Sequence, residues 1–222
     1  MGRFPQSEGA RGSLKWIQKA VNACPELLDK SVLQRIDLAK SITWLSPLAV
    51  DEFAEYRDDA FLDRIQCAQL NSALGEFWPA RGPQWDALGR SDKGDVLLVE
   101  AKAHIDELCS PPTQASESSR VQIQAALAEA AQACHASPRT AWTDMFYQLA
   151  NRIAHLYFLR REGVPAWLVL VNFVGGTEMN GPLSAREWIA AYQVAYHVMG
   201  LGERNPFSRF IMHLYPDVAE LE

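Results

Sequence analysis

The chain has 222 residues, of which 48% are hydrophobic and 22% are charged, and its formal net charge is −6 at pH 7. These values are typical of an ordinary globular protein, and the longest apolar stretch, 164–174, is about half as long as the roughly 20 residues that a membrane-spanning helix needs. We expect no membrane partner, and the negative charge means that any contact with nucleic acid has to come from a local patch.

The N-terminal part of the chain is predicted to be helical. Residues 1–12 are rich in Gly, Ser and Arg and are expected to form a flexible terminus. Apolar residues then recur at helical spacing over 14–21 and 27–36, which predicts an N-terminal helical extension. A short extended segment is expected at 42–45, and a third helix over 51–70.

The middle of the chain has the pattern of short strands. Segments 77–78, 84–89 and 96–103 are rich in aromatic or aliphatic residues and are separated by Gly and Pro, with a strong turn signal at 91–95. The remaining predicted elements are helices over 119–134 and 140–161, a strand over 166–174 that is covered on both faces, a helix over 184–199 and an edge strand over 207–215. This order predicts one α/β domain, 13–222, in which a mixed β-sheet is flanked by helices.

A β-hairpin around 91–95 is predicted to bring acidic residues into register. If these five residues form the loop, counting back along the two strands places Asp86 opposite Glu100. Facing residues of antiparallel strands have Cβ atoms about 4.5–5.5 Å apart, and like charges there are unfavourable. Alternation along the second strand puts Glu100, Lys102 and His104 on one face. Two carboxylates and an amine are therefore expected to converge.

This convergence suits phosphodiester hydrolysis. Mg²⁺ binds oxygen ligands and usually keeps several waters, so two carboxylates are enough to hold it. A bound ion would polarise the phosphoryl oxygen and lower the pKa of a coordinated water. A lysine beside it can position that water and offset the negative charge that develops on phosphorus.

Asp86, thirteen further residues and then Glu100-Ala101-Lys102 form a pattern that resembles the PD-(D/E)xK motif of the restriction-endonuclease-like superfamily. The resemblance implies that fold for a core of about 50–174, with Asp86 and Glu100 as metal ligands and Lys102 as the catalytic lysine. It also implies Mg²⁺ or Mn²⁺ as the cofactor. One departure is Trp85, which stands where the superfamily often has proline.

The Glu100-Ala101-Lys102 triplet has little weight alone, because a chain of this composition contains about 0.7 acidic-x-Lys triplets by chance. Its weight comes from its place late in an apolar strand, after a turn, with Asp86 in cross-strand register. The alternative is a solvated strand edge with an ordinary Glu and Lys.

The superfamily often adds an acidic ligand from the helix before the strands. Glu52, Glu55 and Asp59 would share one face of the predicted helix, and Glu55 is the chosen third metal ligand, with a solvated helix face as the alternative.

Three further residues are expected to contact substrate. Some RecB-like members of the superfamily carry a functional glutamine on a later helix; Gln148 is placed similarly, and Arg152 stands where a tyrosine is expected. Gln148 and Arg152 suit phosphate binding, with simple helix packing as the alternative. His104 could also touch substrate, although a lone His is more often a structural residue.

The sequence thus predicts a divalent-metal-dependent nuclease acting on DNA rather than RNA. The alternative is a catalytically inactive protein of the same fold that serves as a binding or assembly module, which the negative net charge favours. A cytoplasmic location is expected, because the chain starts without an apolar secretory segment and its cysteines are scattered without a Cys-x-x-Cys pair. The oligomeric state stays open, a homodimer included.

Overall fold

A five-stranded mixed sheet forms the centre of the protein in a computed structural model, which describes residues 2–202 and 205–221. The strand order is β2-β4-β5-β6-β7. β2 and β4 are antiparallel, as are β4 and β5, whereas β6 and β7 continue the sheet in parallel with β5. The strands are β2 (Ile42–Ser46), β4 (Ala87–Ser91), β5 (Val96–Lys102), β6 (Ala166–Asn172) and β7 (Ile211–Leu214).

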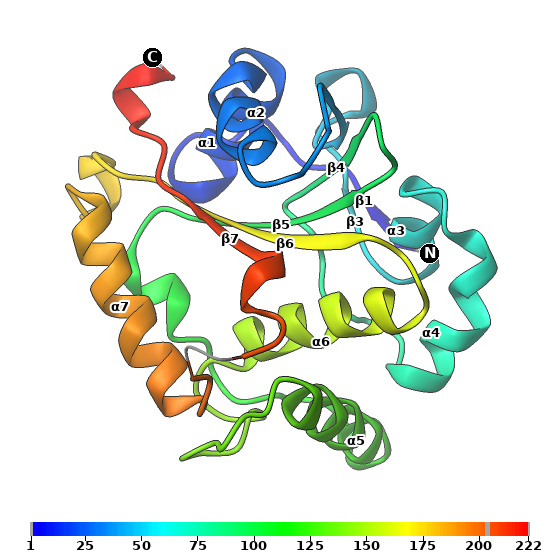
Figure 1. Cartoon of the computed structure of the whole chain (residues 1–222). Helices are drawn as coiled ribbons and strands as arrows, with labels where there is room; N and C mark the ends of the chain where they lie inside the picture. Colours follow the sequence, from blue (N-terminus) through cyan, green and yellow to red (C-terminus); the bar gives the residue numbers. More distant parts are fainter. Residues whose placement is uncertain (1, 203–204, 222) are drawn as a thin grey trace.

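Helices cover both faces of this sheet (Figure 1). In the view of Figure 1, α1 and α2 lie above the sheet and α5 and α6 lie below it. The helices are α1 (Gly12–Asn22), α2 (Pro25–Leu33), α3 (Asp58–Arg64), α4 (Asn71–Phe77), α5 (Glu117–Ala133), α6 (Tyr147–Arg161) and α7 (Ala185–Val198). The predicted mixed sheet flanked by helices is therefore confirmed.

Two buried clusters hold these layers together. Alternate residues of β5 point to opposite faces, so Leu97 and Val99 pack with α1 and α2, whereas Val96 and Leu98 pack with the helices on the other face. Because both faces are covered, all seven residues of β5 are buried. The predicted strand over 166–174 is observed as β6, and it is covered in the same way.

The segment before β4 differs from the prediction. The expected helix over 51–70 is limited to α3, because Glu52, Phe53 and Asp58 adopt positive φ angles of 54°, 49° and 52°, which a right-handed helix does not allow. The expected strand at 77–78 is also wrong, since Phe77 ends α4. The first strand of the antiparallel part is instead β2, which lies earlier in the chain.

The predicted helix over 140–161 starts later than expected. It begins at Tyr147, because Phe146 has a left-handed backbone with φ of 69° and the chain before it forms turns. The α6 helix therefore keeps only the part of the predicted helix that carries Gln148 and Arg152.

Residues 2–12, which were expected to be a loose terminus, lie against the domain. Arg3 and Phe4 form β1 and pair with Tyr56 and Glu55 of β3 (Glu55–Tyr56) in a separate two-stranded sheet. Further along, the backbone N–H of Gly9 donates to a side chain of α1. The segment thus contacts β3 at one end and α1 at the other.

Within the described part of the chain, no helix combines the length and the apolar character needed to cross a membrane.

Candidate active site

The hairpin of β4 and β5 brings Asp86 beside Glu100. The predicted register is confirmed, because Arg90 pairs with Val96 across a loop of residues 91–95. Asp86 lies just before β4, and its Oδ2 accepts the backbone N–H of the residue after Glu100 at 2.7 Å. Its carboxylate is therefore fixed at the end of β5.

Glu100 is buried between two cations. Its Oε1 accepts a hydrogen bond from Lys102 Nζ at 2.9 Å, and its Oε2 accepts one from Arg152 Nε at 2.5 Å. The side chains of all three residues are at most 4% exposed. A buried carboxylate is costly unless it is paired and hydrogen-bonded, so Lys102 and Arg152 are what allows Glu100 to stay ionised here.

The Lys102 ammonium has three acceptors. Besides Glu100, it donates to the backbone carbonyl of Glu107 at 2.8 Å and to Gln148 Oε1 at 3.0 Å. The Glu107 side chain is fixed in turn, because it accepts the N–H of Ala103 at 2.6 Å and the hydroxyl of Ser13 at 3.0 Å. An ammonium has three donor hydrogens, so the position of Lys102 is fully specified.

Glu55 reaches the same region from β3, not from the helix that was expected to carry it. It is buried, and its Oε2 accepts the side-chain amides of Gln84 at 2.5 Å and of Gln6 at 3.1 Å. The predicted helical face of Glu52, Glu55 and Asp59 does not form, because the chain turns at Glu52. Glu52 pairs with Arg3 and Asp59 is exposed, so of the three only Glu55 faces the site.

The carboxylates of Asp86, Glu55 and Glu100 are close enough to repel one another. Burial raises the pKa of Asp86 well above its ordinary value, and the negative charges of Glu100 and Glu55 add to this effect. Burial also raises the pKa of Glu55. Burial acts in the same direction on Glu100, but the charges of Arg152 and Lys102 outweigh it and hold the pKa of Glu100 below its ordinary value.

The three candidate ligands, Asp86, Glu100 and Glu55, have the chemistry that a hard divalent ion prefers. All three groups are carboxylates, and among the described residues no donor reaches Asp86 Oδ1 or Glu55 Oε1. Each oxygen of Glu100 carries one hydrogen bond and keeps a second lone pair. No three His, Cys, Asp or Glu side chains of the described residues are arranged to hold one ion together, so an ion here would depend on fewer carboxylates and on water.

Two cavities meet at this site. One of about 300 Å³ is lined by Glu100, Lys102 and Ser13, and one of about 430 Å³ is lined by Glu55 and Arg152. Both include Asp86, Ser110, Pro111 and Gln148 in their walls. Asp86 and Gln148 therefore stand at the boundary between the two cavities.

The other two predicted substrate contacts have structural partners. Arg152 is buried and also donates to the carbonyl of Gln84 at 2.8 Å, with its guanidinium 4.8 Å from the ring centroid of Trp85. His104 lines neither cavity; its ring lies 3.5 Å from the Glu107 carboxylate, and it precedes the short helix Ile105–Leu108. Both side chains therefore have partners within the protein, and their contact with substrate stays a prediction.

The sequence reasoning missed Gln84, Gln6 and Glu107. Gln84 could have been predicted from the local sequence, because it stands two residues before Asp86 in the same extended segment. Gln6 had no local signal, because its contact with Glu55 depends on how distant segments pack. Glu107 lies five residues after Lys102, but its contact with Ser13 of α1 likewise depends on distant packing.

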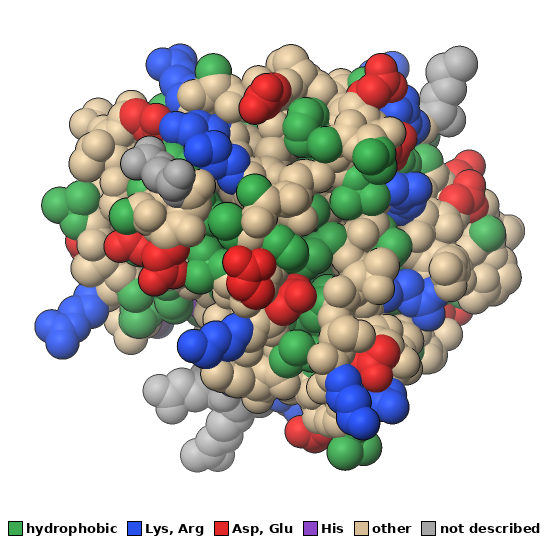
Figure 2. Space-filling model, turned by 90° about the horizontal axis from the view of Figure 1, so that it is seen from above, with side chains coloured by type: hydrophobic (Ala, Val, Ile, Leu, Met, Phe, Trp, Pro, Cys, Tyr) green, Lys and Arg blue, Asp and Glu red, His purple; other side chains and the backbone are tan. Residues whose placement is uncertain are grey.

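Cations do not gather into one broad surface on the side seen in Figure 2, which looks down on α1 and α2. Lys and Arg side chains are scattered there among acidic and apolar ones. The negative net charge is therefore not offset by a continuous basic stripe on this face.

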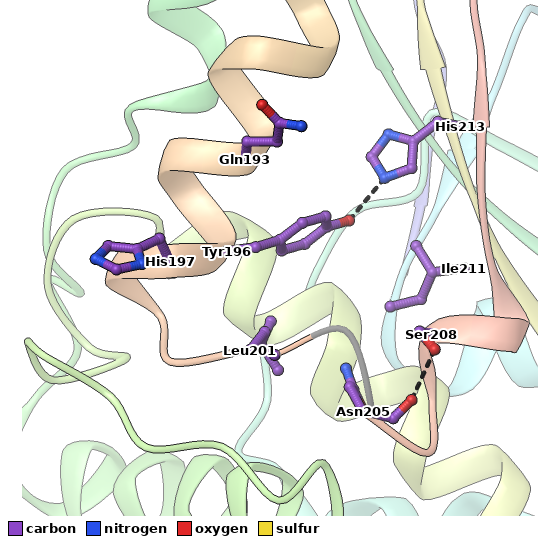
Figure 3. Close-up of a pocket in the computed structure, with 9 residues that line it drawn as sticks. Gln193, Tyr196, His197, Leu201, Asn205, Ser208, Ile211 and His213 are labelled. Carbon is purple, nitrogen blue, oxygen red and sulfur yellow. Dashed lines mark hydrogen bonds between the residues drawn. The ribbon is translucent and has the colours of Figure 1, made fainter.

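A separate cavity of about 580 Å³ lies between α7 and β7 (Figure 3). Two of its polar groups satisfy each other, since the Tyr196 hydroxyl lies 2.8 Å from His213 Nε2. Gly202 and Asn205 are among its lining residues, and residues 203–204 lie outside the described part of the chain. The convergence of charged groups lies at Asp86 and Glu100, and the candidate site is placed there.

Comparisons with protein-family models, with curated proteins and with solved structures found no match for this chain.

Proposed function

We propose that this chain is a divalent-metal-dependent phosphodiesterase that hydrolyses nucleic acid, with DNA as its substrate. The observation that carries the proposal is the convergence of Glu55, Asp86 and Glu100 beside the Lys102 ammonium. A strongly perturbed carboxyl pKa next to a specific charge partner, in a cavity wall, is a mark of a functional site. The proposal includes the restriction-endonuclease-like topology, which the antiparallel β4–β5 hairpin followed by parallel β6 supports.

Asp86 and Glu100 would hold Mg²⁺ or Mn²⁺ together with water ligands, and Glu55 would add negative charge nearby without completing a three-carboxylate arrangement. The ion, when bound, supplies polarisation of the phosphoryl oxygen and a more acidic water. Lys102 is held by three acceptors at the cavity wall, where it offsets negative charge that develops on the phosphate oxygens. Gln148 uses its oxygen for Lys102, which leaves its amide nitrogen to donate to a phosphate oxygen.

Arg152 acts through Glu100 in this scheme. Its guanidinium keeps Glu100 ionised and fixes one of the carboxylate oxygens, so that Glu100 presents an oriented ligand. A cytoplasmic location belongs to the same proposal. It is supported by the four cysteines, which are free in the described part of the chain.

The test is degradation of linear DNA by the purified protein with Mg²⁺, Mn²⁺ or EDTA. Cleavage is expected with either ion and not with EDTA. Lys102→Ala is expected to reduce the rate by about 100- to 1,000-fold, which is the usual effect of removing one preorganised charge-stabilising donor. Lys15→Ala is the matched control, because Lys15 pairs with Glu178 outside both cavities and should keep full activity.

A Lys102→Ala variant that keeps the wild-type melting temperature and the wild-type rate would contradict the proposed mechanism.

A second candidate function is a non-catalytic binding or assembly module of the same fold. The observation that favours it is the pairing of Glu100 with both Lys102 and Arg152, which compensates its charge without an ion. The absence of a three-ligand arrangement among the described residues points the same way. This candidate predicts no cleavage with either ion and no rise in melting temperature when Mg²⁺ or Mn²⁺ is added.

A further inference from the structure

The cavity of about 430 Å³ differs from its neighbour in the kind of side chain that lines it. Its wall contains the neutral polar side chains of Gln84, Gln114, Tyr147 and Asn151, together with the irregular segment 110–113. A volume of this size is within the range of small-molecule sites, roughly 300–1,000 Å³. The cavity is therefore large enough to hold one flat heterocyclic group.

The charges in this wall do not favour a phosphate. Glu55 and Asp86 are acidic, and Arg152 is the one cation among the described residues that line it. The Arg152 guanidinium already donates to Glu100, to the side chain of Asn151 and to the carbonyl of Gln84. A second phosphate here would meet carboxylates rather than free cations.

The neutral groups, by contrast, have unused hydrogen-bonding capacity. Within the described residues no partner is found for Gln84 Oε1, Asn151 Nδ2 or the Tyr147 hydroxyl. Amide side chains read the edges of nucleobases, because they present a donor and an acceptor side by side. Tyr147 is half-buried at the start of α6 and offers an aromatic ring on which a base can stack.

We propose that this cavity binds one unpaired nucleobase next to the scissile phosphate, so that the substrate is single-stranded DNA. The proposal rests on the proposed function, because it places the base beside the carboxylates of the candidate active site. A base inside a duplex could enter only if it were flipped out of the stack, which costs the free energy of its stacking and pairing. The two cations in the described cavity walls, Arg152 and Lys102, are already engaged with protein acceptors and would not offset that cost through phosphate contacts.

The test measures binding separately from cleavage. A fluorescein-labelled DNA strand of mixed sequence is titrated with the full chain in Ca²⁺, which binds the same oxygen ligands as Mg²⁺, and a gel confirms that the strand stays intact. The single strand is expected to bind at least tenfold more tightly than the duplex of the same sequence. A strand of abasic residues with equal length and charge is expected to bind about tenfold more weakly than the normal strand, because base–aromatic stacking and edge contacts are lost.

Tyr147 supplies the matched variants. Tyr147→Leu keeps apolar volume and is expected to weaken binding of the normal strand about tenfold while leaving the abasic strand unchanged. Tyr147→Phe keeps the ring but loses the hydroxyl, and it should weaken binding less than Tyr147→Leu does. Gln114→Ala changes an exposed residue of an irregular segment, so it carries little risk to folding and should weaken binding severalfold. Melting temperatures check that each variant is folded.

Equal affinity for the normal and abasic strands, or for strand and duplex, would overturn the base-binding cavity and leave the nuclease proposal standing if DNA is still cleaved in Mg²⁺. Base-dependent, Tyr147-dependent binding without cleavage in Mg²⁺ or Mn²⁺ would sink the nuclease proposal and keep the cavity as a site for single-stranded DNA.

Discussion

Asp86 is a residue of the candidate site whose ionisation affects the stability of the protein. Its carboxylate is held by a backbone N–H of β5 and lies in the field of two further carboxylates. Burial and those charges raise its pKa, so the folded protein binds a proton at Asp86 more tightly than the unfolded chain does. The ionised form therefore costs stability unless a cation compensates it.

Asp86→Asn is expected to stabilise the protein in EDTA at neutral pH by about 1 kcal/mol, the size of an unfavourable like-charge contact. Because the folded pKa is raised, the stability of the wild type falls as the pH rises from about 4, the unfolded value, through the folded pKa. The gain of the variant should consequently vanish below about pH 4. Urea unfolding at pH 4 and pH 8 measures it.

The control for this prediction is Asp59→Asn, which removes an exposed carboxylate and should change stability little at either pH. An Asp86→Asn variant that is less stable than the wild type at pH 8 would show that Asp86 does not carry an uncompensated charge.

At the scale of elements, α6 joins the site to the core. Residues 149–156 are all buried, because the sheet lies on one side of the helix and α5 on another. Polar side chains on such a helix must be paired, and Arg152 is paired with Glu100 of β5. The Arg152–Glu100 pair therefore holds α6 against the sheet and also fixes the orientation of Glu100.

Arg152→Ala is expected to destabilise the protein by about 3–5 kcal/mol, since it leaves the buried Glu100 with Lys102 as its one remaining cation. Arg161→Ala on the same helix is the control; Arg161 pairs with Glu129 at the partly exposed surface, so its loss should cost less than about 1 kcal/mol. Urea denaturation of the two variants compares them.

If Arg152→Ala costs no more than the Arg161 variant, the Glu100 pair is not a buried interaction and the positioning role of Arg152 is wrong.

At the scale of the whole molecule, the net charge affects how strongly the protein can bind a nucleic acid. The net charge is −6, and Arg152 and Lys102 in the cavity walls are both engaged with Glu100. Few phosphates can be neutralised at once under these conditions. Affinity should then depend on base contacts and on the metal rather than on long-range attraction.

The logarithm of the binding constant for DNA is accordingly expected to fall with the logarithm of salt concentration with a slope no steeper than about −3, as for three or fewer phosphate contacts. Fluorescence anisotropy between about 50 and 200 mM salt measures this slope. A slope near −6 or beyond would mean that a basic surface elsewhere on the molecule binds the backbone.

Local signals were enough for the hairpin and its neighbours. The turn residues at 91–95 determine which residues of β4 and β5 face each other, and this register alone brings Asp86 to Glu100. The apolar run of β6 and the periodicity of α7 were equally informative, because burial on two faces and helical spacing are properties of single segments.

Only the tertiary structure decided how Glu55 reaches the site and which residues hold Lys102. Glu55 arrives on β3, because left-handed residues break the predicted helix and β1 pairs with that strand. Gln148 and Arg152 lie one turn apart on α6 and are distant in sequence from β5, so their contacts with Lys102 and Glu100 follow from the packing of α6 beneath the sheet. Sequence periodicity reports the environment of one segment, whereas the contacts of a site depend on which segments become neighbours.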